Sequence, residues 1–152
     1  MRPAGRAIAA VTVPVAVIAS LWYVQAPPRT RGDYRERAAI TAASLRSQVK
    51  TAGLWVDEIE RERVTHQAAQ VALREAEDDA VATASEFDAW NPPANERRIR
   101  SDITALASET TDALTQLRIA AEDGRWHALS SLARPLPQLA KRLGTARYRA
   151  DP

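Results

Sequence analysis

The first feature of the hydrophobic pattern is an unbroken apolar stretch near the N-terminus. Residues 7–24 carry no charge, follow a short basic segment over 1–6, and have Trp22 and Tyr23 near their far end. As a helix, this run would span about 27 Å, close to the ~30 Å hydrocarbon core of a bilayer. Aromatic rings favour the membrane interface. The pattern predicts a transmembrane anchor that crosses the membrane once.

A cleaved signal peptide and a buried helix of a soluble protein are the alternatives for this segment. The apolar region of a signal peptide usually runs about 7–15 residues, and residues 7–24 exceed that length. The best cleavage pattern ends at Ala26 and is followed by Pro27 and Pro28, which are poor residues beside a scissile bond. We therefore expect the segment to remain attached as an anchor.

The basic residues around the anchor bear on its orientation. Arg2 and Arg6 precede it, and four arginines follow it within 29–37. A count of Lys and Arg places the C-terminal side in the cytoplasm, whereas the short basic N-terminus and the signal-like layout favour the opposite. We expect the N-terminus inside and the bulk of the chain outside the cytoplasm.

After the anchor, the pattern becomes that of long helices. A Pro-rich linker over 25–32 is followed by Asp33 and Glu36, which have the spacing of a capping box. Residues 34–90 contain one Gly and no Pro, which permits a helix of about 55 residues. Its apolar positions alternate steps of four and three at Leu45, Val49, Ala52, Val56 and Ile59. The phase slips after Arg63, and the seam continues mostly as alanine.

The clearest break in the chain is Asn91-Pro92-Pro93, where Asn can cap and Pro favours the first helical position. The next run has an unbroken heptad at Ile99, Ile103, Leu106, Thr110, Ala113, Leu117 and Ala120. Gly124 ends it, and a last helical stretch follows that Pro135 and Pro137 kink or split. We expect residues 145–152 to form a flexible basic tail.

These elements predict an all-α fold: a long, coiled-coil-like antiparallel hairpin over 33–144 that turns at 91–93, with a short Pro-kinked C-terminal helix. A kinked rod and parallel self-association through the heptad are the alternatives. In the hairpin, Trp126 falls level with residue 58, and Gly53 falls level with residue 131, near Pro135.

Composition narrows the class of protein. The chain is rich in alanine, poor in aromatic residues and has no cysteine, which favours long helices and excludes disulfides, thiol catalysis and Cys-ligated zinc. A sheet-based enzyme domain is close to excluded. Arginine greatly outnumbers lysine, but with so much alanine this reflects a GC-rich genome more than nucleic-acid binding. We expect no nucleic-acid partner.

Charge is divided into blocks along the chain. Residues 25–54 carry net +4, 55–90 net −7, 91–123 net −2 and 124–152 net +5. In the hairpin, both basic blocks fall near the membrane and the acidic block forms the distal arm. Five basic residues of the last block are candidates for contact with anionic lipid: Arg134, Lys141, Arg142, Arg147 and Arg149. Leu136, Leu139 and Leu143 would either insert shallowly beside them or close the helical core.

Catalytic and metal-binding patterns are weak. Glu58, Glu62 and His66 share a helix face, but the surrounding segment is so acidic that such a triplet is expected by chance. His127 is expected to pack or to face solvent. We expect no enzymatic activity, no cofactor, no metal and no small-molecule substrate.

The leading interpretation is a non-enzymatic, single-pass protein of the bacterial cell envelope, whose helical domain binds a protein partner or forms a homodimer. The alternative is a membrane-tethered module that senses or binds a ligand near Trp55 and Trp126. The residues expected to form the helix seam and its interactions are Leu45, Val49, Trp55, Val56, Ile59, Ile99, Ile103, Leu106, Leu117 and Trp126.

Overall fold

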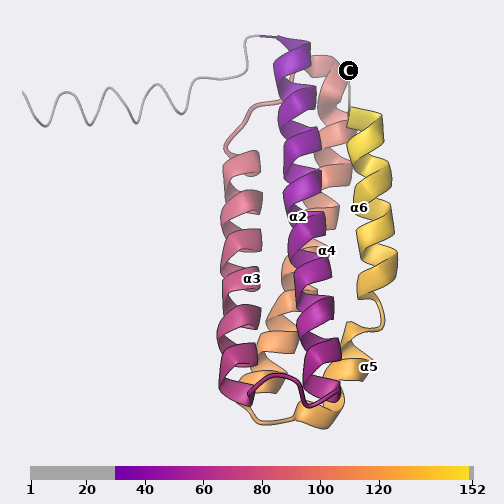
Figure 1. Ribbon diagram of the computed structural model, residues 1–152. Helices are drawn as coiled ribbons and strands as arrows, with labels where there is room; N and C mark the ends of the chain where they lie inside the picture. The colour runs from indigo at the N-terminus through magenta and orange to yellow at the C-terminus, as the bar shows by residue number, and fades with distance from the viewer. Residues whose placement is uncertain (1–29, 151–152) are drawn as a thin grey trace, which may run out of the picture.

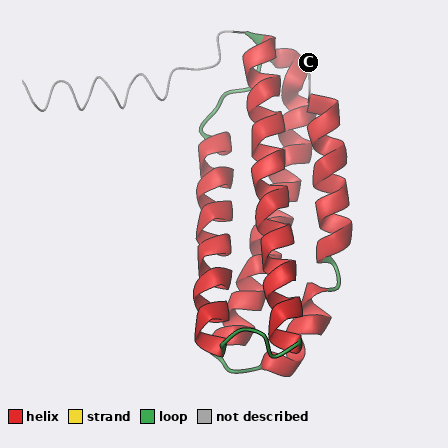
Figure 2. Ribbon diagram, viewed as in Figure 1, coloured by secondary structure: helices red, strands yellow, loops and turns green. Residues whose placement is uncertain are grey.

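The computed structural model describes residues 30–150, and the regular structure within that range is entirely helical (Figures 1 and 2). The all-α prediction is confirmed. The helices are α2 (Arg31–Glu60), α3 (His66–Asp88), α4 (Arg97–Glu122), α5 (Leu129–Ala133) and α6 (Leu136–Ala150). Short 3-10 turns, Ala94–Glu96 and Trp126–Ala128, precede α4 and α5.

The four long helices form an up-and-down bundle rather than the expected two-armed hairpin (Figure 1). Helix α2 packs against α3 and α6, and α4 also packs against both. Consequently α3 and α6 occupy opposite corners, with α2 and α4 between them. The chain therefore covers by itself the apolar faces that a two-helix hairpin would leave open.

The predicted continuous helix over 34–90 is wrong because α2 ends at Glu60 and α3 begins at His66. The turn is a Schellman motif: the N–H of Arg63 donates to the Glu58 carbonyl at 3.0 Å, and that of Glu62 to the Ile59 carbonyl at 2.9 Å. The left-handed position in this motif is usually glycine, but here Glu62 occupies it with a φ of 56°. A helix end without glycine or proline is hard to recognise, although the phase slip after Arg63 marks it.

The start of α2 also differs from expectation. Thr30 is the N-cap: its hydroxyl accepts from the Asp33 N–H at 3.1 Å, and the Asp33 carboxylate accepts from the Thr30 N–H at 3.1 Å. Asp33 is thus the third helical residue of the capping box, not its cap. Arg31 and Gly32, which were predicted to belong to the linker, lie in the first turn of α2.

The chain reverses at Asn91–Pro93, as the sequence pattern predicts. Arg100 of α4 closes this turn. Its guanidinium donates to the Trp90 carbonyl at 2.6 Å and to the Asp88 carbonyl at 3.2 Å. These bonds satisfy carbonyls that the end of α3 leaves free.

The C-terminal part is split near Pro135, as expected, but its tail is not loose. Helix α6 continues to Ala150, which is 1% exposed and packs in one cluster with Tyr34 and Phe87. The apolar spacing of Leu139 and Leu143 continues in Ala146 and Ala150, so the seam extends to the end of the helix.

The core has two parts. A larger cluster fills most of the bundle and includes Leu45, Leu73, Leu114, Leu129 and Leu143. A smaller cluster at the end where α2 begins brings together Tyr34, Phe87, Ile103 and neighbouring alanines, and the Tyr34 and Phe87 ring centroids lie 5.7 Å apart. Alanine supplies much of both clusters, which lets the helices approach closely.

The segment expected to cross the membrane, 7–24, lies outside the described residues, as do 1–6 and 25–29 of the predicted domains. Among the helices of 30–150, none combines the length and apolar character that a membrane crossing requires.

Candidate functional site

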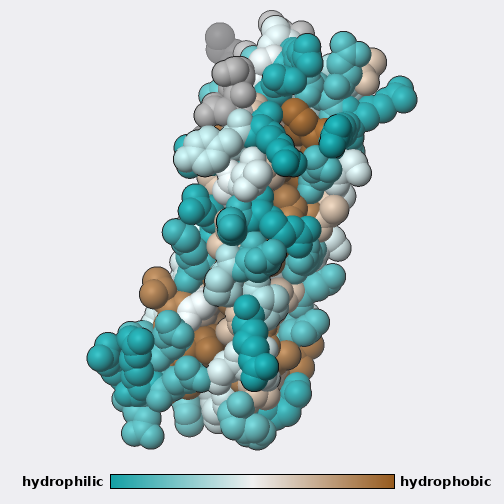
Figure 3. All heavy atoms as spheres, turned by 90° about the vertical axis from the view of Figure 1, so that its right-hand side faces the viewer, coloured by the Kyte–Doolittle hydropathy of each residue, from teal (hydrophilic) through white to brown (hydrophobic). Residues whose placement is uncertain are grey.

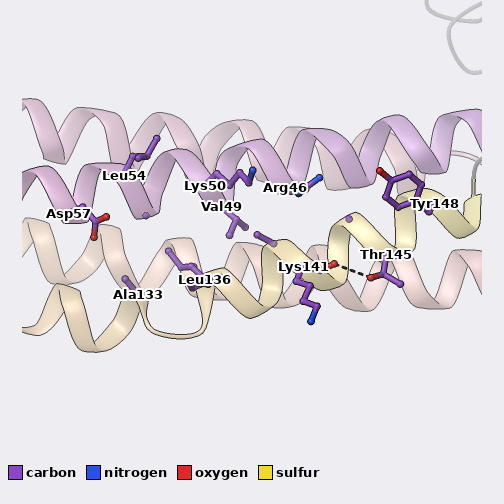
Figure 4. A pocket seen from close by; sticks show the side chains of 14 residues that line it. Arg46, Val49, Lys50, Leu54, Asp57, Ala133, Leu136, Lys141, Thr145 and Tyr148 are labelled. Carbon is purple, nitrogen blue, oxygen red and sulfur yellow. Dashed lines mark hydrogen bonds between the residues drawn. The ribbon is translucent and has the colours of Figure 1, made fainter.

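A groove with a volume of about 820 Å³ lies between α2 and α6 (Figure 4). Val49 of α2 and Leu136 of α6 point toward one another across its floor, whereas Leu54 and Lys141 point away from it. Tyr148 reaches from the last turns of α6 toward α2. The groove is lined by Arg46, Val49, Lys50, Gly53, Leu54, Asp57, Ala133, Leu136, Pro137, Ala140, Lys141, Gly144, Thr145 and Tyr148.

Two helical glycines lie along this groove. A Cβ atom added at Gly53 would lie 3.9 Å from the Leu136 Cδ1 atom, which is ordinary contact. One added at Gly144 would lie 3.4 Å from the Arg46 Cζ atom. The missing side chain of Gly144 therefore leaves room for the Arg46 guanidinium to lie against α6.

The groove combines an apolar floor with positive charge. Arg46 lies partly buried at one end, and its Nε atom is buried without a hydrogen-bond partner among the described residues. Lys50 and Lys141 are exposed along the two walls. Asp57 at the other end is its acidic lining residue. Such a surface suits a partner that offers apolar side chains flanked by carboxylates.

Exposed apolar side chains continue along the same face. Leu54 is 64% exposed and Tyr148 is 78% exposed, one on each wall of the groove. On the face that carries α6, apolar patches break up a mostly hydrophilic surface (Figure 3). A water-exposed leucine and tyrosine beside an apolar floor mark a place where burial by a partner would be favourable.

Charge is segregated across the bundle between two of its helices, and the acidic block is not the expected distal arm. Helix α3 contains six acidic residues and one basic residue, whereas α6 contains four basic residues and no acidic one. Because these helices occupy opposite corners, one side of the bundle is acidic and the other basic. The acidic block does not form a tip, since α3 runs back beside α2 and brings Glu86 to within 3.3 Å of Arg37.

A buried carboxylate ties α2 to the start of α4. The Glu96 side chain is 1% exposed and accepts from the Nε atoms of Arg31 and Arg35, the second at 3.0 Å. Burial by itself raises the pKa of Glu96, but the hydrogen bonds and positive charges of the two arginines outweigh it, so the pKa of the carboxyl is lowered. The cluster ties together the bundle end nearest residue 30.

A second ionic network joins α3 to α4. Glu77 accepts from Arg118 and from the Thr115 hydroxyl at 2.6 Å, and Glu122 accepts from Arg74 at 2.6 Å and from Arg118 at 2.5 Å. The hydrogen bond from Arg74, followed by the effect of Arg118, lowers the pKa of Glu122. These contacts fix the α3–α4 pair.

Most residues expected to form the helix seam lie inside the bundle. Ile99, Trp55 and Trp126 are half-buried at its edge. Seven are buried in the core: Leu45, Val49, Val56, Ile59, Ile103, Leu106 and Leu117. Their burial leaves them facing neighbouring helices of the same chain, so the surface open to a partner is elsewhere. Trp126 is stacked on the His66 ring, with centroids 4.0 Å apart and planes at 7°.

The weak metal-binding pattern and the candidate lipid contacts have different outcomes. No group of three or more His, Asp or Glu side chains that could hold a metal ion occurs within 30–150, so Glu58, Glu62 and His66 are not brought together as ligands. Leu136, Leu139 and Leu143 are at most 2% exposed and close the core, which rules out their shallow insertion into a membrane. The five basic candidates remain on the surface: Arg134, Lys141, Arg142, Arg147 and Arg149.

Two of those arginines have partners or neighbours in the bundle. Arg142 pairs with Glu109 of α4 at 2.6 Å. Arg142 and Arg149 line a smaller hollow of about 320 Å³ between α4 and α6.

Sequence reasoning missed the α2–α6 groove, although its two helical glycines were a usable signal. It placed Gly53 near Pro135 in a two-helix register, and Gly53 does face Leu136, but through the return of α6 along α2.

A scan against protein-family models, a search of the curated proteins and a search of the solved structures returned no match to this chain.

Proposed function

We propose that this chain is a non-enzymatic, membrane-tethered helical bundle that binds a helix of a partner protein in the groove between α2 and α6. The observation that carries the proposal is the combination of an apolar floor, two exposed apolar side chains and basic walls in one groove. Helix-in-groove binding uses this arrangement, with apolar anchors on the floor and charges that set orientation at the rim.

The exposed rim of the groove suits a helix. Gly53 and Gly144 face the opposing helix, where an added Cβ atom would meet Leu136 and Arg46, so they let α2 and α6 pack closely beneath a partner. Leu54 and Tyr148, which are 64% and 78% exposed, offer the apolar contact, and Lys50 and Lys141 attract carboxylates on the flanks of the incoming helix.

The membrane tether is the second part of the proposal, and it rests on the uncharged segment 7–24. Helix α2 begins at Arg31, only a few residues after that segment. A tether of this length keeps the bundle close to the bilayer, so its partner would be another membrane protein or one bound at the membrane surface.

A ligand-binding module is the second candidate function. The groove volume of about 820 Å³ falls in the range of small-molecule pockets. The position expected for a ligand, between Trp55 and Trp126, does not favour this function, because Trp126 is occupied by the His66 ring. The exposed walls at Leu54 and Tyr148 favour a larger, helical occupant.

Site-specific photo-crosslinking of the full-length chain in its own host membrane tests the proposal. A photoreactive amino acid at Leu54 or Tyr148 is expected to form protein adducts whose partner peptide, identified by mass spectrometry, is an amphipathic helical segment with acidic residues. The matched control is Ser101, which is exposed on α4, and it should give no such adduct. Groove adducts with lipid or small molecules only, or equal adducts from Ser101, would contradict the proposal.

A further inference from the structure

We propose that the helix bound in the α2–α6 groove is α3 of a second copy of this chain, so that the bundles associate side by side in a row. This inference rests on the proposed function, because it names the partner of the same groove. It is carried by charge complementarity between two surfaces on opposite sides of one bundle.

The outward stripe of α3 has the chemistry that the groove requires. Val71, Glu75, Asp78 and Ala82 follow steps of four, three and four, and all four are exposed. They face away from the buried stripe that includes Leu73 and Ala80. Val71 is 52% exposed. Within the described chain, Glu75 and Asp78 take part in no ion pair. The stripe thus offers one apolar anchor, one small residue and two free carboxylates.

The heights of the two surfaces match when neighbouring copies stand in the same orientation. Inside one bundle, Gln48 bonds Asp79 at 3.1 Å and Ser44 lies 3.3 Å from Thr83, so residue i of α2 is level with residue 127 − i of α3. By this relation Val71 is level with residue 56 and Asp78 with residue 49. A neighbour at the same height therefore brings its Val71 to within two residues of the level of Leu54, and its Asp78 to within one residue of the level of Lys50.

The same geometry determines the kind of assembly. Since α3 and α6 lie at opposite corners, the surface used on one copy differs from that used on the next. Such a heterologous contact repeats and forms a row or a ring rather than a closed two-fold dimer. All copies keep the α2 start at the same end, as chains anchored in one membrane must.

Cysteine crosslinking can test this contact directly because the chain has no native cysteine. Full-length Leu54→Cys and Val71→Cys variants are reconstituted in zwitterionic lipid vesicles, separately and mixed, and treated with a short thiol-to-thiol crosslinker. Both positions are exposed, so the substitutions leave the core unchanged. We expect dimers only in the mixture, and a ladder of higher species when one chain carries both cysteines. A mixture of Leu54→Cys with Ser101→Cys is the matched control and should not crosslink.

Charge reversal provides the specificity test. Lys50→Glu with Lys141→Glu on the Leu54→Cys chain should lower crosslinking about tenfold, as should Glu75→Lys with Asp78→Lys on the Val71→Cys chain. Mixing the two reversed chains should restore it, because the charges then match again. Circular dichroism of each variant confirms that it is folded.

Three results would overturn the inference: crosslinking of Leu54→Cys with itself as strongly as in the mixture, equal yield with the Ser101→Cys control, or no crosslinked dimer at all. The photo-crosslinking experiment separates these failures from failure of the proposed function. Groove adducts that contain a helix of another protein would retain the function and reject the second copy. Absence of any protein adduct would reject both.

Discussion

Replacing Glu62 with glycine is expected to stabilise the bundle by about 0.5–1 kcal/mol. Glu62 has a φ of 56° at the end of α2, and the turn has the Schellman hydrogen-bond pattern. A side chain in the left-handed region costs roughly 1–2 kcal/mol, and glycine avoids that cost but loses part of the gain to its greater freedom in the unfolded chain. The end of α4 provides an internal reference, because the same pattern there has glycine, Gly124, with a φ of 70°.

Thermal unfolding of the full-length chain in mild detergent, followed by far-ultraviolet circular dichroism, measures the effect. For a domain of this size we expect Glu62→Gly to raise Tm by about 2–5 °C. Gly124→Ala should lower Tm by a comparable amount, since it places a Cβ atom in the same conformation. Glu62→Ala keeps the Cβ atom and removes the charge, so it measures the contribution of the Glu62 charge to stability.

An unchanged or lowered Tm of Glu62→Gly, with Gly124→Ala destabilising, would contradict this prediction. Equal stabilisation by Glu62→Ala and Glu62→Gly would also contradict it, because the gain would then come from charge and not from the backbone. Either result would mean that the α2–α3 turn is not held in the left-handed conformation in solution.

Glu96→Gln should make the free energy of unfolding fall less steeply as the pH becomes acidic, measured by chemical unfolding at a series of pH values. The lowered pKa of Glu96 means that its contribution is complete above the unfolded pKa of about 4.3 and is lost as pH falls through the folded value. Gly53→Ala should raise the free energy of unfolding by about 0.5–1 kcal/mol, because alanine favours the helix and its Cβ atom meets Leu136 at ordinary distance; a loss measured in the same assay would contradict this. Leu114→Ala should cost about 2–5 kcal/mol, since Leu114 is fully buried in the larger core cluster and the change leaves a cavity; a smaller loss would show that the Ala-rich core collapses around the site.

The sequence pattern predicted the features that depend on residues close together in the chain. The steps of four and three identified the buried face of α2 at Leu45, Val49 and Val56, because helix periodicity and burial are linked directly. The reversal at Asn91–Pro93 was predictable since proline restricts the backbone wherever it occurs. The turn at Glu62 was missed because its conformation is imposed by packing of α2 on α3 and not by the residue type.

The helical class, the seam positions and the Pro-containing turn were thus determined by the sequence itself, because each follows from local backbone preference and periodic burial. The bundle topology and the α2–α6 groove were decided by the tertiary structure. Gly53 and Gly144 are 91 residues apart in the chain, and they form one groove only because α6 returns along α2. The separation of acidic α3 from basic α6 has the same origin: sequence order supplies the charges, but only the packing of four helices places them on opposite sides.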